Sequence, residues 1–91
     1  MNQARGEIAI EIDGSEHIMC LTLGALAELE ARFECQSLRD LQARLKRLTA
    51  SELLDVLAIL MITKPATDAL ARLAPAVAAK AVAEAFDAAL G

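Results

Sequence analysis

The sequence predicts an α+β fold, in which a β-hairpin at about residues 7–21 runs directly into a set of helices. Ile8, Ile10 and Ile12 alternate with polar or smaller residues, which is the period-two pattern of a half-buried strand. Asp13-Gly14 then supplies two residues that accept the positive φ angles of a tight hairpin turn. Beyond the hairpin, leucines recur at spacings of three and four, the period of amphipathic helices.

Helix starts and breakers divide the rest of the chain. Thr22 and Ser37 stand where N-caps are expected, and Thr49-Ala50-Ser51-Glu52 has the sequence of a full capping box. Pro75 suits the first turn of a last helix. We therefore expect four to five helices, at about residues 23–34, 38–48, 50–62, 67–73 and 75–90.

The chain is long enough for one domain, residues 1–91, with residues 1–6 expected to fray. Hydrophobic residues make up 56% of it, which favours a folded core over disorder. In the first helix, Glu28 and Arg32 have the spacing of an ion pair. Gly24 lowers helix propensity, so its presence suggests close approach of a strand or another chain.

Charge is unevenly distributed along the chain. The formal net charge is −4, and residues 1–34 hold seven acidic residues against two basic ones. Residues 35–47 reverse this balance, with four basic residues against Asp40. The basic residues are candidates for an electrostatic contact between copies or with a partner: Arg39, Arg44, Lys46 and Arg47. A pair of solvated faces without a partner is the alternative.

The third expected helix has no polar residue between Asp55 and Thr63, so it is apolar on every side. Such a helix is either central to the core or partly given to a partner, and both interpretations stay open. In the last helix, Val82, Phe86 and Leu90 form an i,i+4 ladder beside many alanines that permit close packing. The candidate partner-binding residues on these two helices are Leu53, Val56, Leu57, Leu60, Met61, Val82 and Phe86.

Residues for catalysis or for binding a metal or cofactor are scarce. His17, Cys20 and Cys35 match no zinc spacing, and we expect a surface histidine and a buried cysteine in the hairpin. The four glycines are scattered, so no phosphate-binding loop is present. The sequence therefore predicts no enzyme, no metal site and no cofactor.

Nucleic-acid and membrane binding are also disfavoured. The chain is acidic and has no Trp or Tyr, whereas phosphate tracking and base stacking need basic and aromatic side chains. A helix-turn-helix at about residues 38–62 would place an apolar and acidic helix in the major groove. The longest apolar run, Val56–Ile62, is too short for a bilayer. With two cysteines and no signal segment, a bacterial cytoplasmic setting is expected.

The hairpin and the segment after it resemble the tail assembly family of gene transfer agents and related phages. The resemblance rests on Arg5-Gly6-Glu7, the Ile-rich strand, Asp13-Gly14, and Leu21-Thr22-Leu23-Gly24-Ala25-Leu26-Ala27-Glu28-Leu29-Glu30 with Phe33. It covers roughly Arg5 to Leu60. Such proteins often have a glycine-rich connection after the third helix, where this chain has Thr63-Lys64-Pro65.

This resemblance implies a non-enzymatic tail assembly protein of the tail-tube-associated or assembly-chaperone type. Its partners would be tail tube or tape-measure components, and it would be cytoplasmic or associated with the virion. A structural subunit of the tail tube is the first alternative, and a small helical transcriptional regulator is the second. A homo-oligomer also remains open.

Overall fold

The α+β fold class is confirmed by the computed structural model, which describes residues 6–63, 65 and 67–90. A two-stranded antiparallel hairpin is followed by helices, as the sequence predicts. In chain order the elements are β1 (Glu7–Ile12), β2 (Ser15–Cys20), α1 (Leu23–Arg32), α2 (Leu38–Arg44), the 3-10 turn η2 (Leu45–Arg47), α3 (Ala50–Leu60), α4 (Thr67–Ala71) and α5 (Pro75–Leu90).

The hairpin has the register that its turn dictates. Ile12 pairs with Ser15, and Asp13 and Gly14 between them have φ angles of 52° and 79°. Positive φ at both turn positions is the type I′ geometry that matches the twist of paired strands. Because side chains alternate along a strand, this register directs Ile8, Ile10 and Ile12 to one face, where all three are buried.

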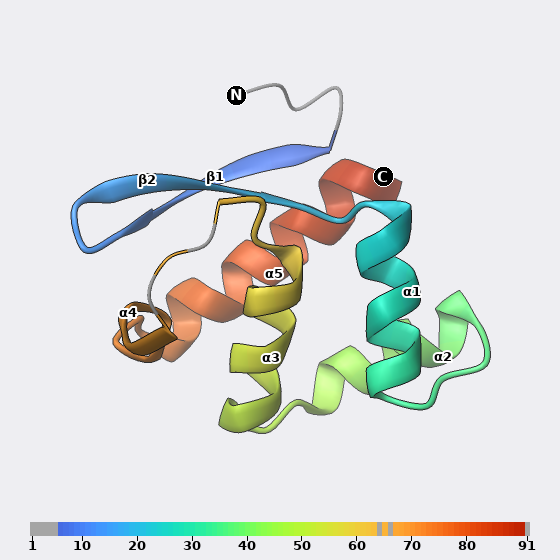
Figure 1. The fold of residues 1–91 in the computed structure, drawn as a ribbon. Coiled ribbons are helices and arrows are strands. Elements are labelled where there is room, and N and C mark those ends of the chain that lie inside the picture. The colour runs from blue at the N-terminus through green and yellow to red at the C-terminus, as the bar shows by residue number, and fades with distance from the viewer. Residues whose placement is uncertain (1–5, 64, 66, 91) are drawn as a thin grey trace.

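The helices pack under that face of the hairpin. Figure 1 shows the two strands across the top of the molecule, with α3 and α1 descending from them and α5 crossing behind α3. The most deeply buried side chains come from the hairpin, α1, α2, α3 and α5, and they form one core: Ile12, Met19, Leu29, Leu41, Val56, Leu57, Leu60 and Ala85. A hairpin alone is marginal in water, and this helical layer covers its apolar face.

The segment after α3 pairs with the outer edge of β2. The expected helix to residue 62 ends at Leu60, because Met61 has an extended conformation and bridges to Met19. The backbone N–H of Ile62 donates to the carbonyl oxygen of Ile18 at 2.8 Å. This backbone pairing satisfies one edge of the hairpin and draws the chain out of the helix, a tertiary effect that helix periodicity does not reveal.

Other helix ends differ from the sequence expectation by a few residues. The first helix stops at Arg32 rather than 34, since Glu34 has a positive φ of 55°. The second tightens into the 3-10 turn η2 instead of continuing to residue 48, and α4 ends at Ala71 rather than 73. The bounds of α5 agree with the prediction. The expected cap at Thr22, the Ser37 cap and the full Thr49–Glu52 capping box are all confirmed.

Two expectations for the first helix were wrong. Arg32 pairs with Asp55 of α3 at 2.6 Å rather than with Glu28, because its side chain points toward the neighbouring helix. Among the described residues, a Cβ on Gly24 would meet nothing nearer than the Thr22 hydroxyl oxygen at 3.9 Å, so neither strand of the hairpin approaches it. Close approach of another chain, the other half of that expectation, stays a prediction. The close approach occurs at Gly6, which has a φ of 81° and whose Cβ would lie 3.4 Å from Cα of Ala89. Gly6 is buried, so the expected fraying does not extend to it; residues 1–5 lie outside the described part.

Candidate functional site

Most of the candidate partner-binding residues on α3 lie in the core. Val56, Leu57, Leu60 and Met61 are buried beneath the hairpin and against α5. The all-apolar helix is thus covered by its own chain on several sides, and these four side chains are not exposed to a partner in this structure. Leu53, one turn earlier, is half-buried and reaches the surface.

A groove runs along the side of α5 that faces η2 and the start of α3. It consists of three adjoining hollows, of about 440, 220 and 360 Å³, which share lining residues. We call it the α5 groove, and its lining includes Leu45, Lys46, Leu48, Leu53, Ala79, Val82, Ala83, Phe86 and Asp87. Val82, Phe86 and Leu53 from the sequence prediction therefore come together here, and Leu57 lines the hollow beside the start of α3. Val56, Leu60 and Met61 do not line the groove.

The groove is open because α5 carries alanine where a larger residue would fill it. Ala79 and Ala83 lie one turn apart on its exposed side, with Val82 and Phe86 below them in the core. Leu45 and Leu48 on the opposite wall are half-buried. The alanine-rich side of α5 is evident in the sequence, but the opposite wall is not, because the path of η2 depends on tertiary packing.

Of the four candidate basic residues, Lys46 alone is among the residues that line the groove. Lys46 is exposed, and Arg39 is exposed on α2, outside the groove lining. Arg47 is exposed on η2. Arg44 is different. Its guanidinium group pairs with Glu52, donates to the carbonyl oxygen of Arg47 at 3.0 Å, and lies over the Phe33 ring.

The start of α3, which presents Leu53 to the groove, is held by a capping box. The Glu52 carboxylate accepts from the backbone N–H of Thr49 at 2.9 Å, and the Thr49 hydroxyl accepts from the backbone N–H of Glu52 at 3.2 Å. The hydrogen bond from Thr49, and secondly the one from Arg44, lower the pKa of Glu52 below its usual value. The groove wall therefore begins at a fixed helix terminus.

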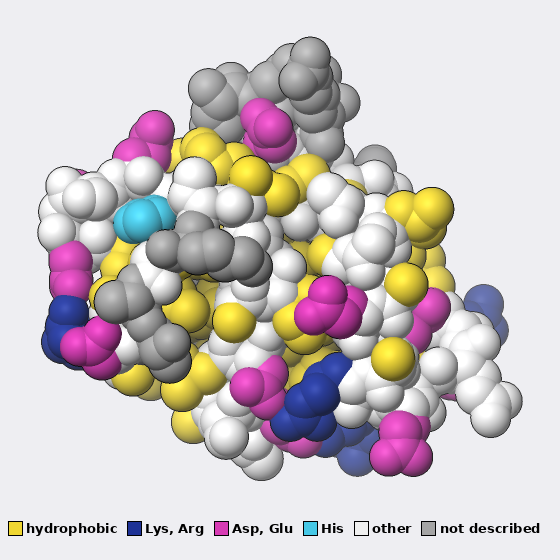
Figure 2. Space-filling view, in the orientation of Figure 1, with side chains coloured by type: hydrophobic (Ala, Val, Ile, Leu, Met, Phe, Trp, Pro, Cys, Tyr) yellow, Lys and Arg dark blue, Asp and Glu magenta, His cyan; other side chains and the backbone are white. Residues whose placement is uncertain are grey.

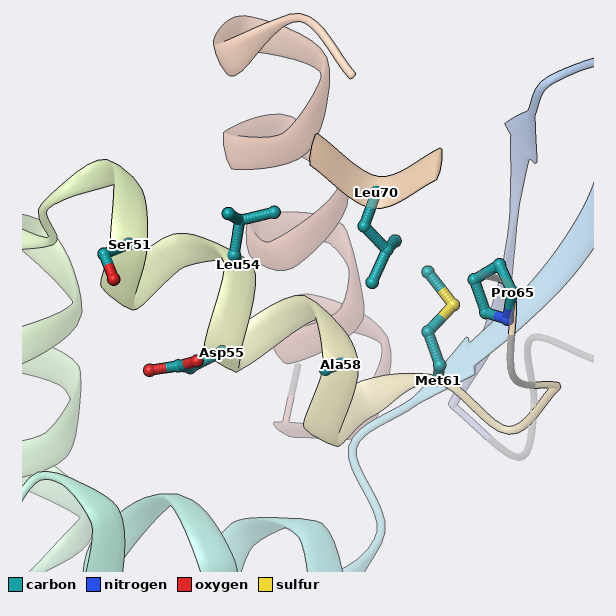
Figure 3. A pocket seen from close by; sticks show the side chains of 7 residues that line it. All are labelled: Ser51, Leu54, Asp55, Ala58, Met61, Pro65 and Leu70. Carbon is teal, nitrogen blue, oxygen red and sulfur yellow. The ribbon is translucent and has the colours of Figure 1, made fainter. Parts of the chain in front are cut away.

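A second hollow, of about 400 Å³, lies between α3 and α4 (Figure 3). Met61 and Leu70 point toward each other across it and Pro65 lies beside Met61, whereas Asp55 points away from them. Asp55 is the partner of Arg32, so it is not a free acid in this hollow. The lining is mainly apolar and carries no pair of groups suited to acid–base chemistry.

A metal-binding cluster is not found in the part of the chain that the structure describes. No three His, Cys, Asp or Glu side chains there could hold a metal ion. Nδ1 of His17 is 3.0 Å from the Thr63 hydroxyl oxygen, and this histidine is half-buried rather than fully exposed. Cys20 is buried, as predicted, and neither Cys20 nor Cys35 forms a disulfide. Among the described residues, no helix is both long and apolar enough to cross a membrane.

The arrangement of α2 and α3 does not favour DNA recognition. The first two turns of α3, where base contacts would be expected, carry Glu52 and Asp55. These acids are ion-paired with Arg44 and Arg32, which neutralises cations that could otherwise contact phosphate. The regulator alternative gains no support from this geometry.

The α5 groove has a mainly apolar lining. In a comparison with known families, residues 5–91 match the family described as phage tail tube protein, GTA-gp10. The chain belongs to this family. No curated protein and no solved structure matches it.

Family membership confirms the resemblance that the hairpin and residues 21–30 predict, and makes the chain a phage tail tube-related protein. The match is longer than expected. The resemblance in the sequence extends only to about Leu60, whereas the family match continues through α4 and α5 to residue 91. The α5 groove, which these last helices help to form, is thus part of the region that the family shares.

Proposed function

We propose that this protein is a non-enzymatic tail assembly protein, which binds tail tube or tape-measure components during tail morphogenesis. The observation that carries the proposal is the apolar α5 groove in a chain of the tail tube protein family. Other tail proteins are the partners expected for a member of this family. The groove gives them a place to bind.

A helical segment is the natural occupant of such a groove. Amphipathic helices bind by laying apolar side chains into a hydrophobic groove, with charged residues at the rim setting register. The α5 groove has an apolar floor of Val82 and Phe86, and its rim carries one cation, Lys46, and one acid, Asp87. This shape favours a partner helix with apolar residues on one side and charged residues of both signs at the edge.

The test is tail production in cells that carry the tail genes, with two variants of α5. Ala83→Glu lengthens an exposed residue inside the groove and adds a negative charge there. Val77→Glu changes an exposed residue that is not among the groove lining. We expect Ala83→Glu to abolish assembled tails and Val77→Glu to leave their number unchanged. Normal tails from folded Ala83→Glu protein would refute the groove as the working surface.

A structural subunit retained in the tail tube is the second candidate, and the family's description as a tail tube protein favours it. The two functions differ in where the protein is found at the end of assembly. Mass spectrometry of purified tails separates them: a retained subunit is present at the stoichiometry of the tube, whereas an assembly chaperone is absent from finished particles.

A further inference from the structure

The outer edge of β1 carries backbone groups that no described segment satisfies. In a hairpin closed by a two-residue turn, the residues beside the turn bond to each other, and every second pair after them does the same. Ile12, Ile10 and Ile8 therefore bond to β2, and the N–H and C=O groups of Ala9 and Glu11 point to the opposite side. Among the described residues, no backbone hydrogen bond joins Ala9 or Glu11 to a segment on that side.

The outer edge of β2 is different, because this chain's own extended segment after α3 occupies it. Ile18 is the partner of Ala9 in the hairpin. Its carbonyl oxygen accepts from the backbone N–H of Ile62 at 2.8 Å, and its N–H donates to the Thr63 hydroxyl oxygen at 3.3 Å. One edge of the hairpin is thus completed within the chain, and the other is open to an added strand.

The sequence of β1 restricts access to this edge by charge alone. Natural edge strands resist pairing through prolines, bulges or charged residues. β1 has no proline, and its register with β2 runs without a bulge from Glu7 to Ile12. Its charged residues are Glu7 and Glu11, and the Glu11 side chain is exposed. Such an edge repels an acidic strand and attracts a basic one.

Glu11 stands in an unfavourable pair. It lies directly opposite Glu16 of β2, and like charges opposite each other on one face of a hairpin are destabilising. In the described part of the chain, neither carboxylate belongs to an ion pair. The described residues up to the end of β2 include no Lys or Arg that could relieve the repulsion. A cation from outside the chain would relieve it.

The surroundings leave the hairpin acidic. On α5, which packs against β1, the exposed Lys80 and Glu84 are opposite in sign and one turn apart, so their charges offset. Asp13 at the hairpin turn is paired with Arg72, and Arg5 lies outside the described residues. Figure 2 shows mainly Asp and Glu among the charged side chains at the top and left, along the hairpin, whereas most Lys and Arg of this face lie at the lower right.

We propose that the outer edge of β1 receives an extended segment of a different protein, which adds to the hairpin as a further strand. Its backbone bonds to the N–H and C=O groups of Ala9 and Glu11. Side chains alternate between the two faces of a strand, so the segment carries Lys or Arg opposite Glu11 and apolar residues on the side of Ile10. No β1 residue lines the α5 groove, so this surface is separate from that of the proposed function.

Charge disfavours a second copy of this chain as the occupant. Two β1 strands paired antiparallel about Ala9 would set Glu7 of each copy opposite Glu11 of the other. Both pairs oppose like charges on one face, beside the existing pair of Glu11 with Glu16. A segment with Lys or Arg at that position replaces the repulsion by attraction.

Binding of synthetic peptides to the full-length protein tests the proposal. The probe is a short peptide of alternating valine and lysine with blocked ends. One control replaces its lysines by glutamate, and another carries a methyl group on the backbone nitrogen of each lysine, which removes the N–H groups that strand addition needs. We expect calorimetry to show binding of the probe that weakens with salt, and binding about tenfold weaker or less for either control.

Three variants locate the binding on β1, and circular dichroism verifies that each is folded. Glu11→Lys should weaken binding of the probe by about fivefold or more and strengthen that of the glutamate peptide. Glu28→Lys makes the same change of net charge at an exposed site on α1, and should bind the probe like the wild type. Ala9→Pro removes an outward N–H, which an edge strand tolerates, and should weaken binding by about tenfold.

Amide hydrogen exchange provides a readout at the edge itself. Without peptide, the N–H groups of Ala9 and Glu11 should exchange faster than those of the three isoleucines of β1, which bond to β2. The bound probe should slow exchange at Ala9 and Glu11 and leave the isoleucines unchanged. This alternation is specific to a strand added at the outer edge, because contact with the face of the hairpin does not produce it.

Three outcomes would overturn the proposal: no binding of the probe, equal weakening by Glu11→Lys and Glu28→Lys, or slowed exchange elsewhere than at Ala9 and Glu11. Equal weakening would mean that the probe responds only to net charge. None of these results bears on the α5 groove, which the tail production of Ala83→Glu tests separately. Normal tails from that variant would refute the groove and leave the β1 edge standing.

Discussion

The guanidinium carbon of Arg44 lies 5.1 Å from the centroid of the Phe33 ring, and that of Arg32 lies 5.2 Å from the same ring. Arg44 also pairs with Glu52 at the start of α3. One arginine from α2 therefore links the end of α1 to the first turn of α3. Phe33 is half-buried, and the guanidinium groups of Arg32 and Arg44 both lie over its ring, where cation–π attraction stabilises them.

Replacement of Arg44 should reduce stability, unlike replacement of the neighbouring basic residues. Arg44→Ala loses the contact with Phe33, which is worth about 1 kcal/mol, and also leaves Glu52 without its cation. We expect Arg39→Ala, at an exposed position on α2, to unfold like the wild type. Urea unfolding followed by circular dichroism measures both. Equal midpoints for Arg44→Ala and the wild type would show that this link contributes nothing.

The capping box predicts a specific dependence of stability on pH. The hydrogen bond from Thr49, and then the one from Arg44, hold the pKa of Glu52 below its usual value in the folded state. The resulting stability is fully present above the pKa of the unfolded chain, about 4.3, and is lost as the pH falls through the lower folded value. Glu52→Gln should thus be less stable than the wild type at pH 7, and the difference should vanish at about pH 2.

Equilibrium urea unfolding at a series of pH values tests this dependence, and Glu84→Gln, on the exposed side of α5, is the control. A second variant separates the cap from the charge. Thr49→Ala removes the hydroxyl that accepts from the backbone N–H of Glu52, and should destabilise the protein by about 1 kcal/mol at neutral pH. A pH profile of Glu52→Gln that runs parallel to the wild type would contradict the assignment of this carboxylate.

How much of this structure the sequence predicts depends on how local each feature is. The hairpin turn at Asp13-Gly14 and the caps at Thr22 and Thr49 were predictable, because each is set by residues within one turn of itself. The end of α3 was not. Met61 leaves the helix to pair with β2, and that partner is about forty residues away, beyond the reach of periodicity.

The candidate site was predicted in part for the same reason. Val82 and Phe86 follow from the apolar ladder of α5 and do form the groove floor. The apolar run of α3 is compatible with a core helix and with a partner-binding surface, so the sequence alone does not choose between them. In the structure its later residues face the hairpin and α5, and only its first two turns reach the groove. The opposite wall, with Leu45 and Leu48, depends on the 3-10 turn, which the leucine spacing alone presents as more helix.

Because the later α3 residues are buried, substitutions there should reduce the stability of the fold, and any loss of partner binding would follow from that. Leu60 is fully buried, so Leu60→Ala removes core contacts and should destabilise the protein by about 2–5 kcal/mol. Leu23→Ala, the same chemical change at an exposed site, should stay within about 0.5 kcal/mol of the wild type. Thermal unfolding measures both. Similar melting temperatures for the two variants would contradict the burial of Leu60 beneath the hairpin.

The two glycines Gly14 and Gly24 should respond in opposite directions to the same substitution. Gly14 has a φ of 79°, and a Cβ there would meet no atom within 4 Å, so Gly14→Ala introduces backbone strain without a clash. Its cost should be about 1 kcal/mol. Gly24 is helical, and a Cβ there meets only the Thr22 hydroxyl oxygen at 3.9 Å, so Gly24→Ala should stabilise the protein by about 0.5–1 kcal/mol. Urea unfolding of the pair checks both signs, and a destabilising Gly24→Ala would contradict the open space around this position among the described residues.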